Sequence, residues 1–485
     1  MNPDPIPPAA PEKAAVPEAP ALAPRLGLFD ITMLVMGSVI GAGIFVVPHT
    51  VAALVPAPAP VLAAWVVGGL ISMAGGLVYA DLARRRPHVG GQYAFLREAY
   101  HPALAFVYGW SLLWVIQSGG MAAVAVVFGT YFNQLLRLLG ETAAPASDAL
   151  TAALAIAAVT AVNCTGARAG STAQNVLMSL KTLAILTLIL CGLLAADARW
   201  PVLHRHEAPG DWLPPTAFAA ALVQVFFAYG GWHTTTFLAA EVRDPTRTLP
   251  RGLILGVTGV IVLYLGVSLA CLRVLGAEEL AVNTSPAAAV MRRALGAPGA
   301  ALLSAGVAVS ALGFVSQASL TSPRVYYAMA RDGLFFRGVA WVHPRTRSPV
   351  LAVLLQGTFA LVLAVTRTFQ EILNSVMCVE MTFFALTALG LFVIRRRDGS
   401  APGPAGRAVP GHPVTTLLFA AVNVALVLGL FYREPANSAA VAAIALAGLP
   451  AYCLWTRRSR RVGAEPATTG GDGGVSGPPP SQPGP

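Results

Sequence analysis

The chain has 485 residues, of which 56% are hydrophobic and 11% are charged, and its mean hydropathy is +0.66. A soluble domain carries about 25% charged residues, so this composition excludes an ordinary soluble enzyme and predicts a polytopic membrane protein. The net charge of +10 does not indicate a nucleic-acid partner, because the basic residues gather beside apolar segments.

We expect an all-α protein with twelve membrane-spanning helices. The approximate bounds of these spans are 29–55, 59–83, 103–136, 149–166, 172–197, 214–240, 251–275, 299–330, 349–366, 370–394, 412–432 and 437–456. The flanking segments 1–25 and 461–485 are rich in Pro, Ala, Gly and Ser, which predicts disordered tails. Residues 1–25 also lack the apolar core of a signal peptide.

The distribution of basic residues predicts the topology. If both termini are cytoplasmic, most of the 32 lysine and arginine residues lie on the cytoplasmic side of the membrane. This bias is the positive-inside rule. The clusters that carry it are Arg84 to Arg86, Arg395 to Arg397, and Arg457, Arg458, Arg460 and Arg461.

The first span contains three glycines in seven residues, Gly37, Gly41 and Gly43. Glycine is a poor helix former, so we expect the helix to break here and a half-helix to begin near Ile44. The free N–H groups and positive dipole end of that half-helix would form a carboxylate site. The alternative is that the Gly37-xxx-Gly41 pattern only permits close packing of helices.

A lysine, Lys181, lies about a third of the way into the fifth span. A charged side chain inside a membrane span is costly, so this position predicts a functional residue. The alternative is that the long side chain reaches back to the membrane interface.

The sixth span carries a second interruption, Gly230-Gly231, within the aromatic stretch 226–233. Glycine-interrupted spans at corresponding positions of two halves indicate a substrate site between inverted repeats. We therefore expect one repeat of five helices over 26–200 and a second over 213–397. The last two helices, over 410–460, are appended to these repeats.

These motifs resemble the amino acid–polyamine–organocation superfamily, and most closely its L-type amino acid transporter branch. The similarity covers nearly the whole chain between the tails. It rests on four stretches in order, which are Gly37-Ser-Val-Ile-Gly-Ala-Gly-Ile-Phe45, Phe227-Ala-Tyr-Gly-Gly-Trp232, Ala240-Glu-Val-Arg-Asp-Pro245 with Leu249-Pro-Arg251, and Ser319-Leu-Thr-Ser-Pro-Arg324 with Ala330-Arg-Asp-Gly333.

The resemblance implies the five-plus-five inverted-repeat (LeuT-like) fold with broken first and sixth helices, and alternating access to a mid-membrane site. It places the substrate carboxylate on the amides of Gly41, Ala42, Gly43 and Ile44. It places the substrate ammonium on carbonyls of the unwound sixth helix, near Phe226, Phe227 and Tyr229 in the stretch that includes Ala228 and Gly230, together with Ile40 of the first helix. Phe227 would gate the site, and Lys181 would occupy the place of a sodium ion and tie the first helix to the eighth, which implies sodium independence.

Two features depart from the family pattern. His233 stands where relatives often have Asn or a small or aromatic residue, so it is either a pH-sensitive group of the pocket or a hydrogen-bonded spacer. The loop 137–148 lacks the cysteine with which animal L-type transporters bond a heavy chain, so we expect no disulfide-linked heavy chain.

Other polar residues in the spans have two interpretations each. Glu380 in the tenth span is either a proton site or a hydrogen-bonding group between helices. Gln117 and Ser118 either line the pocket or link helices. Asp81 and Glu241 form inner-gate ion pairs, with Arg84 to Arg86 and with Arg243, or solvated surface pairs.

The sequence thus predicts a secondary transporter that binds an α-amino acid, with no enzymatic motif, no cofactor and no metal site. The five cysteines lack metal-ligand spacing. No acidic residue falls in the two glycine motifs, which favours a neutral substrate. Exchange and proton symport both remain open, as do a polyamine or cationic amino acid permease and a receptor that does not translocate. The Ala-, Arg- and Gly-rich composition favours a bacterial inner membrane.

Overall fold

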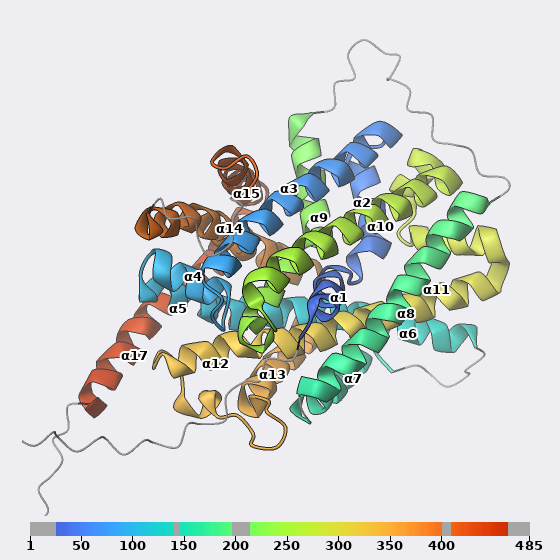
Figure 1. Cartoon of the computed structure of the whole chain (residues 1–485). Coiled ribbons are helices and arrows are strands. Elements are labelled where there is room, and N and C mark those ends of the chain that lie inside the picture. Colours follow the sequence, from blue (N-terminus) through green and yellow to red (C-terminus); the bar gives the residue numbers. More distant parts are fainter. Residues whose placement is uncertain are drawn as a thin grey trace, which may run out of the picture.

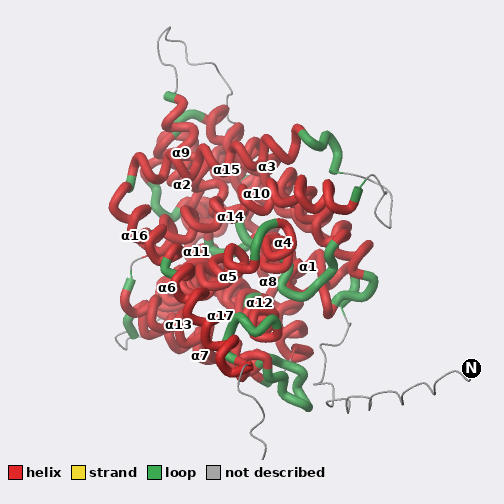
Figure 2. Tube along the Cα trace, turned by 90° about the vertical axis from the view of Figure 1, so that its left-hand side faces the viewer, coloured by secondary structure: helices red, strands yellow, loops and turns green. Residues whose placement is uncertain are grey.

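The protein is helical throughout the part of the chain that the structure describes. The computed structural model describes residues 26–139, 146–165, 167–195, 214–367, 369–399 and 409–463, with side chains for all of these but 167–173, 369–371 and 458–463. Among these residues there is no strand, and the one isolated β-bridge joins Leu26 to Val242. Figure 1 and the side view in Figure 2 show helices joined by loops. The predicted tails lie almost wholly outside the described residues.

Most of the helices follow one another after only a few residues. Most of them are α-helices (labelled α), while η1 is a π-helix and η2 and η3 are 3-10 helices. In chain order they are α1 (Leu28–Val39), α2 (Gly43–Leu54), α3 (Pro58–Arg85), α4 (Gln92–Ala99), α5 (Pro102–Ser111), η1 (Leu112–Ile116), α6 (Gln117–Leu138), α7 (Asp148–Cys164), α8 (Ala167–Leu194), α9 (Pro215–Tyr229), η2 (Trp232–Glu241), α10 (Pro245–Val282), α11 (Pro286–Thr321), α12 (Pro323–Arg331), η3 (Arg337–Ala340), α13 (Val350–Thr366), α14 (Phe369–Asp398), α15 (Val414–Arg433), α16 (Pro435–Leu446) and α17 (Gly448–Gly463).

Each predicted span coincides with a helix or with consecutive helices. Within the described residues, eight helical segments are long and apolar enough to cross a membrane, and the pair α1 and α2, bent by 45°, makes a ninth if it is one span. Apolar side chains such as Leu70 (63% exposed) and Leu428 (64% exposed) face outward, as they do on a lipid-contacting surface. The chain is therefore a polytopic all-α membrane protein. The total of twelve spans and the inverted repeat stay predictions.

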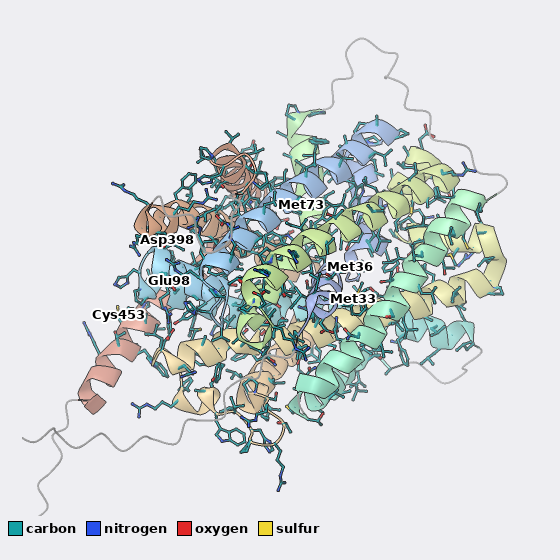
Figure 3. All side chains as sticks on the ribbon, viewed as in Figure 1. Met33, Met36, Met73, Glu98, Asp398 and Cys453 are labelled. Atoms are coloured by element: carbon teal, nitrogen blue, oxygen red, sulfur yellow. The ribbon has the colours of Figure 1, made fainter. Side chains whose placement is uncertain are left out.

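The first helix lies in the middle of the bundle. α1 packs against α8, α10, α11 and η2 (Figure 1). Side chains of the same helix, including Met33 and Met36, point towards the surrounding helices (Figure 3). This helix is therefore enclosed by segments from both halves of the chain.

An ionic cluster joins the ends of α3, α4 and α14. Asp81 accepts hydrogen bonds from Arg84 and from Arg395 (2.6 Å). Arg86 donates to Glu98 and to Asp398 (2.6 Å), the two acidic residues labelled at this end in Figure 3. The predicted pairing of Asp81 with Arg84 is therefore present, and the unpredicted pairs with Arg395 and Asp398 of α14 connect helices from both halves of the chain.

Glu241 pairs with a different partner from the one expected. Its carboxylate accepts a hydrogen bond from Arg324 Nε (2.8 Å), and both residues are buried. The prediction that Glu241 pairs with Arg243 was therefore wrong, because the partner is Arg324. Arg324 lies 83 residues away in the sequence, at the start of α12, and no local spacing indicates that these two residues meet.

Candidate functional site

The first span is broken over three residues. α1 ends at Val39, Ile40 is extended (φ −73°, ψ 91°), and α2 begins at Gly43, one residue before the predicted start. The Gly41 N–H donates to the Val39 carbonyl (2.9 Å), so this amide is occupied within the break. The amides at the start of α2 have no intrahelical partner, as at any helix N-terminus. They can bind an anion.

The sixth span is broken at its paired glycines. α9 ends at Tyr229, and the segment resumes as the 3-10 helix η2 at Trp232. Gly231 has φ +101°, a conformation that favours glycine. A Cβ atom at Gly231 would lie 2.3 Å from the carbonyl oxygen of Ser38, so only glycine fits. The second predicted break is therefore present, and it presses against the end of α1.

The two breaks contact each other a second time, at Gly43 and Ala228. A Cβ atom at Gly43 would lie 3.2 Å from Cα of Ala228. The hydroxyl oxygen of Tyr264, from α10, lies 3.1 Å from the carbonyl oxygens of both Val39 and Ala228, so its one O–H is shared between these two acceptors. One side chain therefore holds the C-terminal ends of α1 and α9 together.

Two further side chains fix the first break. Lys181 of α8 is fully buried, and its Nζ donates to the carbonyls of Gly37 (2.9 Å) and Ile40 (2.5 Å). Ser310 of α11 donates to the carbonyl of Gly41 (3.0 Å). The side chain of Lys181 thus points inward to α1 and not to the membrane interface, and α11 reaches the same break through Ser310.

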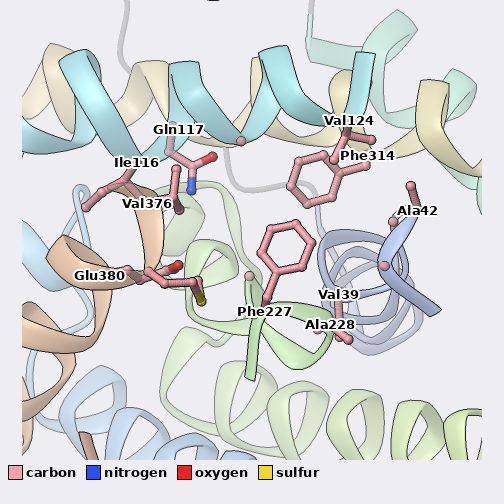
Figure 4. Close-up of a pocket in the computed structure, with 16 residues that line it drawn as sticks. Val39, Ala42, Ile116, Gln117, Val124, Phe227, Ala228, Phe314, Val376 and Glu380 are labelled. Atoms are coloured by element: carbon pink, nitrogen blue, oxygen red, sulfur yellow. The ribbon is translucent and has the colours of Figure 1, made fainter. Parts of the chain in front are cut away.

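A cavity of about 50 Å³ lies beside the two breaks. Figure 4 shows the rings of Phe227 and Phe314 inside it, with Gln117 and Glu380 towards one end and Ala42 towards the other. The walls come from α1, α2, η1, α6, α9, α11 and α14 and from the two breaks. The lining residues are Val39, Gly41, Ala42, Gly43, Ile116, Gln117, Gly120, Val124, Phe227, Ala228, Gly230, Gly231, Phe314, Val376, Met377 and Glu380.

The structure gathers most of the predicted site residues. Those that line the cavity are Gly41, Ala42, Gly43, Phe227, Ala228, Gly230 and Glu380. Those behind the lining are Ile40, Ile44, Phe226, Tyr229, His233 and Lys181. Gln117 lines the cavity, whereas Ser118 does not. Phe314, Val124, Val376 and Met377 were missed, because apolar residues in apolar spans carry no local signal of facing a cavity.

Glu380 and His233 form a buried pair at one end of the cavity. Oε1 of Glu380 lies 3.6 Å from Nε2 of His233, and the two side chains are 8% and 1% exposed. The His233 ring packs edge-on against Tyr79 and Phe384, so aromatic groups surround it. His233 does not line the cavity, but its partner Glu380 does.

The arrangement is suited to a zwitterion. A helix N-terminus binds an anion, and the carbonyls at a helix C-terminus attract a cation. Here the start of α2 and the end of α9 lie side by side at one cavity. Among the described residues, no group of three or more His, Cys, Asp or Glu side chains is placed to hold a metal ion.

The sequence is similar to known membrane transporters. Residues 26–450 match the family described as "Amino acid permease". The chain is 28% identical over 441 residues to "Large neutral amino acids transporter small subunit 2" of Mus musculus, covering 90% of this chain and 81% of that protein. It is 29% identical over 433 residues to "Serine/threonine exchanger SteT" of Bacillus subtilis (strain 168), covering 88% of this chain and 96% of that protein. It is 27% identical over 421 residues to "b(0,+)-type amino acid transporter 1" of Homo sapiens, covering 86% of this chain and 85% of that protein.

Proposed function

Because this chain belongs to the amino acid permease family, we propose that it is a sodium-independent exchanger of neutral L-amino acids that works by alternating access. Members of this family transport and do not catalyse a reaction. The observation that carries the proposal is the contact between the two helix breaks at one cavity.

The backbone supplies the groups for the part that all amino acids share. The substrate carboxylate would bind the amides of Ala42, Gly43 and Ile44 at the start of α2. The ammonium would bind carbonyls at the end of α9, near Phe226 and Phe227. The Phe227 ring fills part of the cavity between these two groups, as expected of a gate (Figure 4).

The position of Lys181 supports sodium independence. Its ammonium group binds two backbone carbonyls of α1, which are the ligands that a sodium ion would otherwise take. Because the lysine is covalently part of the protein, the first helix is held without a coupling cation. Proton symport through Lys181 or Glu380 is the second candidate, and the buried carboxyl of Glu380 at the cavity favours it.

The cavity favours a small neutral side chain. A volume of about 50 Å³ has room for roughly four water molecules at about 10–15 Å³ each. Two phenylalanine rings and no unpaired acidic group face it, because Glu380 is paired with His233. Among the relatives, the names that refer to large neutral amino acids and to serine and threonine agree with a neutral substrate but differ in the size of its side chain.

The proposal includes a membrane topology and the absence of a disulfide-linked partner. We place the two repeats at 26–200 and 213–397 and both termini in the cytoplasm of a bacterial cell, with the protein in the inner membrane. The protein works without a disulfide-linked heavy chain, since the loop between α6 and α7 contains no cysteine.

Uptake by the purified protein in proteoliposomes tests this function. Radiolabelled alanine, serine, leucine and arginine are supplied outside, with or without internal amino acid, and with sodium or choline as the external cation. Uptake of alanine or serine that needs internal amino acid and is unaffected by sodium supports the proposal. Uptake driven by an inward proton gradient alone would make the protein a symporter, and binding without uptake would make it a receptor.

A further inference from the structure

We propose that the carboxylate of Glu380 binds the substrate ammonium together with the carbonyls at the end of α9, and that Glu380 and His233 hold one proton in its place when the site is empty. This inference rests on the proposed transport of amino acids. It adds a side-chain ligand to a site otherwise built from backbone, and it makes the proton a competitor of the substrate.

The first step is the position of Glu380 relative to the second break. Gly230 lies between the carboxylate and the carbonyls that end α9. The point at which a Cβ atom of residue 230 would stand is 3.3 Å from the Phe227 carbonyl oxygen, 3.5 Å from that of Phe226 and 3.9 Å from Oε2 of Glu380. Three oxygen atoms therefore surround a space that glycine leaves open, and an ammonium group entering the space can reach all three.

The second step is the availability of the carbonyls. In a continuous helix the N–H of Gly230 would donate to the Phe226 carbonyl. Here the Gly230 N–H donates to the Phe227 carbonyl instead, at 3.2 Å, because the helix ends. The Phe226 carbonyl thereby loses its helical donor, and the negative end of the α9 dipole favours a cation at this point.

The third step is the cost of an unpaired charge. Glu380 and His233 are 6% and 1% exposed, and Glu380 makes its one ion-pair contact in the described part of the chain with His233. A lone carboxylate at this depth is unfavourable. The pair is electrically neutral when it holds one proton, either on the carboxyl or on the imidazole. A bound ammonium gives the same neutrality without that proton.

Among the described residues, His233 is the one ionisable partner within ion-pair distance of Glu380. The buried hydroxyls of Tyr79, from α3, and Tyr108, from α5, also interact with it electrostatically. Gln117 of α6 faces the cavity as an uncharged amide. Lys181 is engaged with α1 carbonyls. The charge balance at this end of the cavity therefore depends on the pair and its ligand.

These steps define an exchange of one cation for another. As the substrate ammonium arrives, the O–H bond of Glu380, or the N–H bond of protonated His233, breaks and the proton passes to water in the open cavity. The carboxylate electron pair then accepts a hydrogen bond from the ammonium. On release of the substrate, a proton from the same water returns to the pair. Proton and substrate compete, so the apparent affinity for the substrate falls as the pH is lowered.

The test measures the KM for alanine in proteoliposomes at several pH values between 5.5 and 7.5, with equal pH on both sides. The proteins are the wild type, Glu380→Gln, His233→Gln and the control Glu279→Gln, whose carboxylate lies in a partly exposed pair with Arg293. We expect the wild-type and control KM to rise about tenfold or more towards low pH. We expect Glu380→Gln to raise the KM at pH 7.5 by about 10- to 100-fold, because a charged ligand is lost, and to remove the dependence on pH. His233→Gln, which keeps the carboxylate, should change the pH at which the KM rises.

A structural role for Glu380 predicts a different pattern. If Glu380→Gln lowers only the amount of folded protein, its KM and pH profile match those of the wild type, and the proposal is overturned. It is also overturned if the variant loses affinity for lysine or arginine while keeping that for alanine, since Glu380 then contacts the substrate side chain. If the wild type transports no amino acid at all, the proposed function itself fails. A wild-type protein that transports amino acids with a KM independent of pH contradicts only the present inference.

Discussion

The ammonium group of Lys181 donates a 2.5 Å hydrogen bond to the carbonyl oxygen of Ile40, at the break in the first helix. The two residues lie 141 positions apart, on α8 and at the end of α1. A fully buried cation is stabilised here by carbonyl oxygens that have lost their helical donors. The break and the lysine therefore depend on each other.

Replacing Lys181 by methionine should keep the shape of the side chain and remove both hydrogen bonds. Leaving one buried acceptor unsatisfied costs about 1–3 kcal/mol, so we expect exchange of labelled alanine to fall by about tenfold or more. Leu180→Met, on the exposed side of the same helix, is the control and should retain wild-type exchange. Exchange by the methionine variant at the wild-type rate would show that the lysine contributes only to packing.

Gly231→Ala tests the contact between the two breaks. The added Cβ atom would lie 2.3 Å from the Ser38 carbonyl oxygen, in addition to the strain of a positive φ. Gly276→Ala is a matched control, because Gly276 has φ +74° and no atom within 4 Å of its Cβ position. Gly276 has φ +74° and ψ 170°, where the backbone strain of an alanine alone costs about 1–3 kcal/mol, so the control should lower the thermal stability. Gly231→Ala should abolish exchange or folding, and equal behaviour of the two variants would argue against the contact.

The sequence was sufficient to locate the two breaks and the buried lysine. Each is a local exception to an apolar helix, since glycine favours unwinding and a charge in a membrane span needs a partner. The start of α2 was predicted within one residue for the same reason. Signals of this kind can be recognised without knowing which helices pack together.

The sequence was not sufficient to show which residues meet at the site. The pair of Glu380 and His233 spans about 150 positions, and each residue alone had two interpretations, neither of which included the other residue as its partner. Phe314 is one apolar residue in the 36-residue helix α11, and only its neighbours show that it faces the cavity. The 3-10 form of η2 depends on packing against α1 and α10, so no propensity predicted it.

Tyr264→Phe removes one hydroxyl from the junction of α1 and α9. That hydroxyl is shared between the carbonyls of Val39 and Ala228, and both acceptors would lose a buried partner. We expect the free energy of unfolding to fall by about 1–3 kcal/mol, measured by thermal or denaturant unfolding in detergent, together with slower exchange. Tyr432→Phe, at a position 87% exposed, should change neither quantity. If the two variants are equally stable, the hydroxyl does not hold the breaks together.

Phe314→Ala should change which amino acids the protein accepts. The Phe314 ring faces Phe227 across the cavity and lies 3.4 Å from the Cβ position of Gly41, so its removal enlarges the space beside the first break. One methylene group in an apolar pocket alters discrimination by about 10- to 200-fold. We therefore expect the ratio of kcat/KM for leucine to that for alanine to rise by at least about tenfold, measured by initial rates of exchange.

Leu312→Ala, two positions away and outside the cavity lining, controls for loss of packing in α11 and should leave this ratio unchanged. A ratio that stays the same in Phe314→Ala while exchange continues would place the substrate side chain elsewhere in the cavity, away from Phe314.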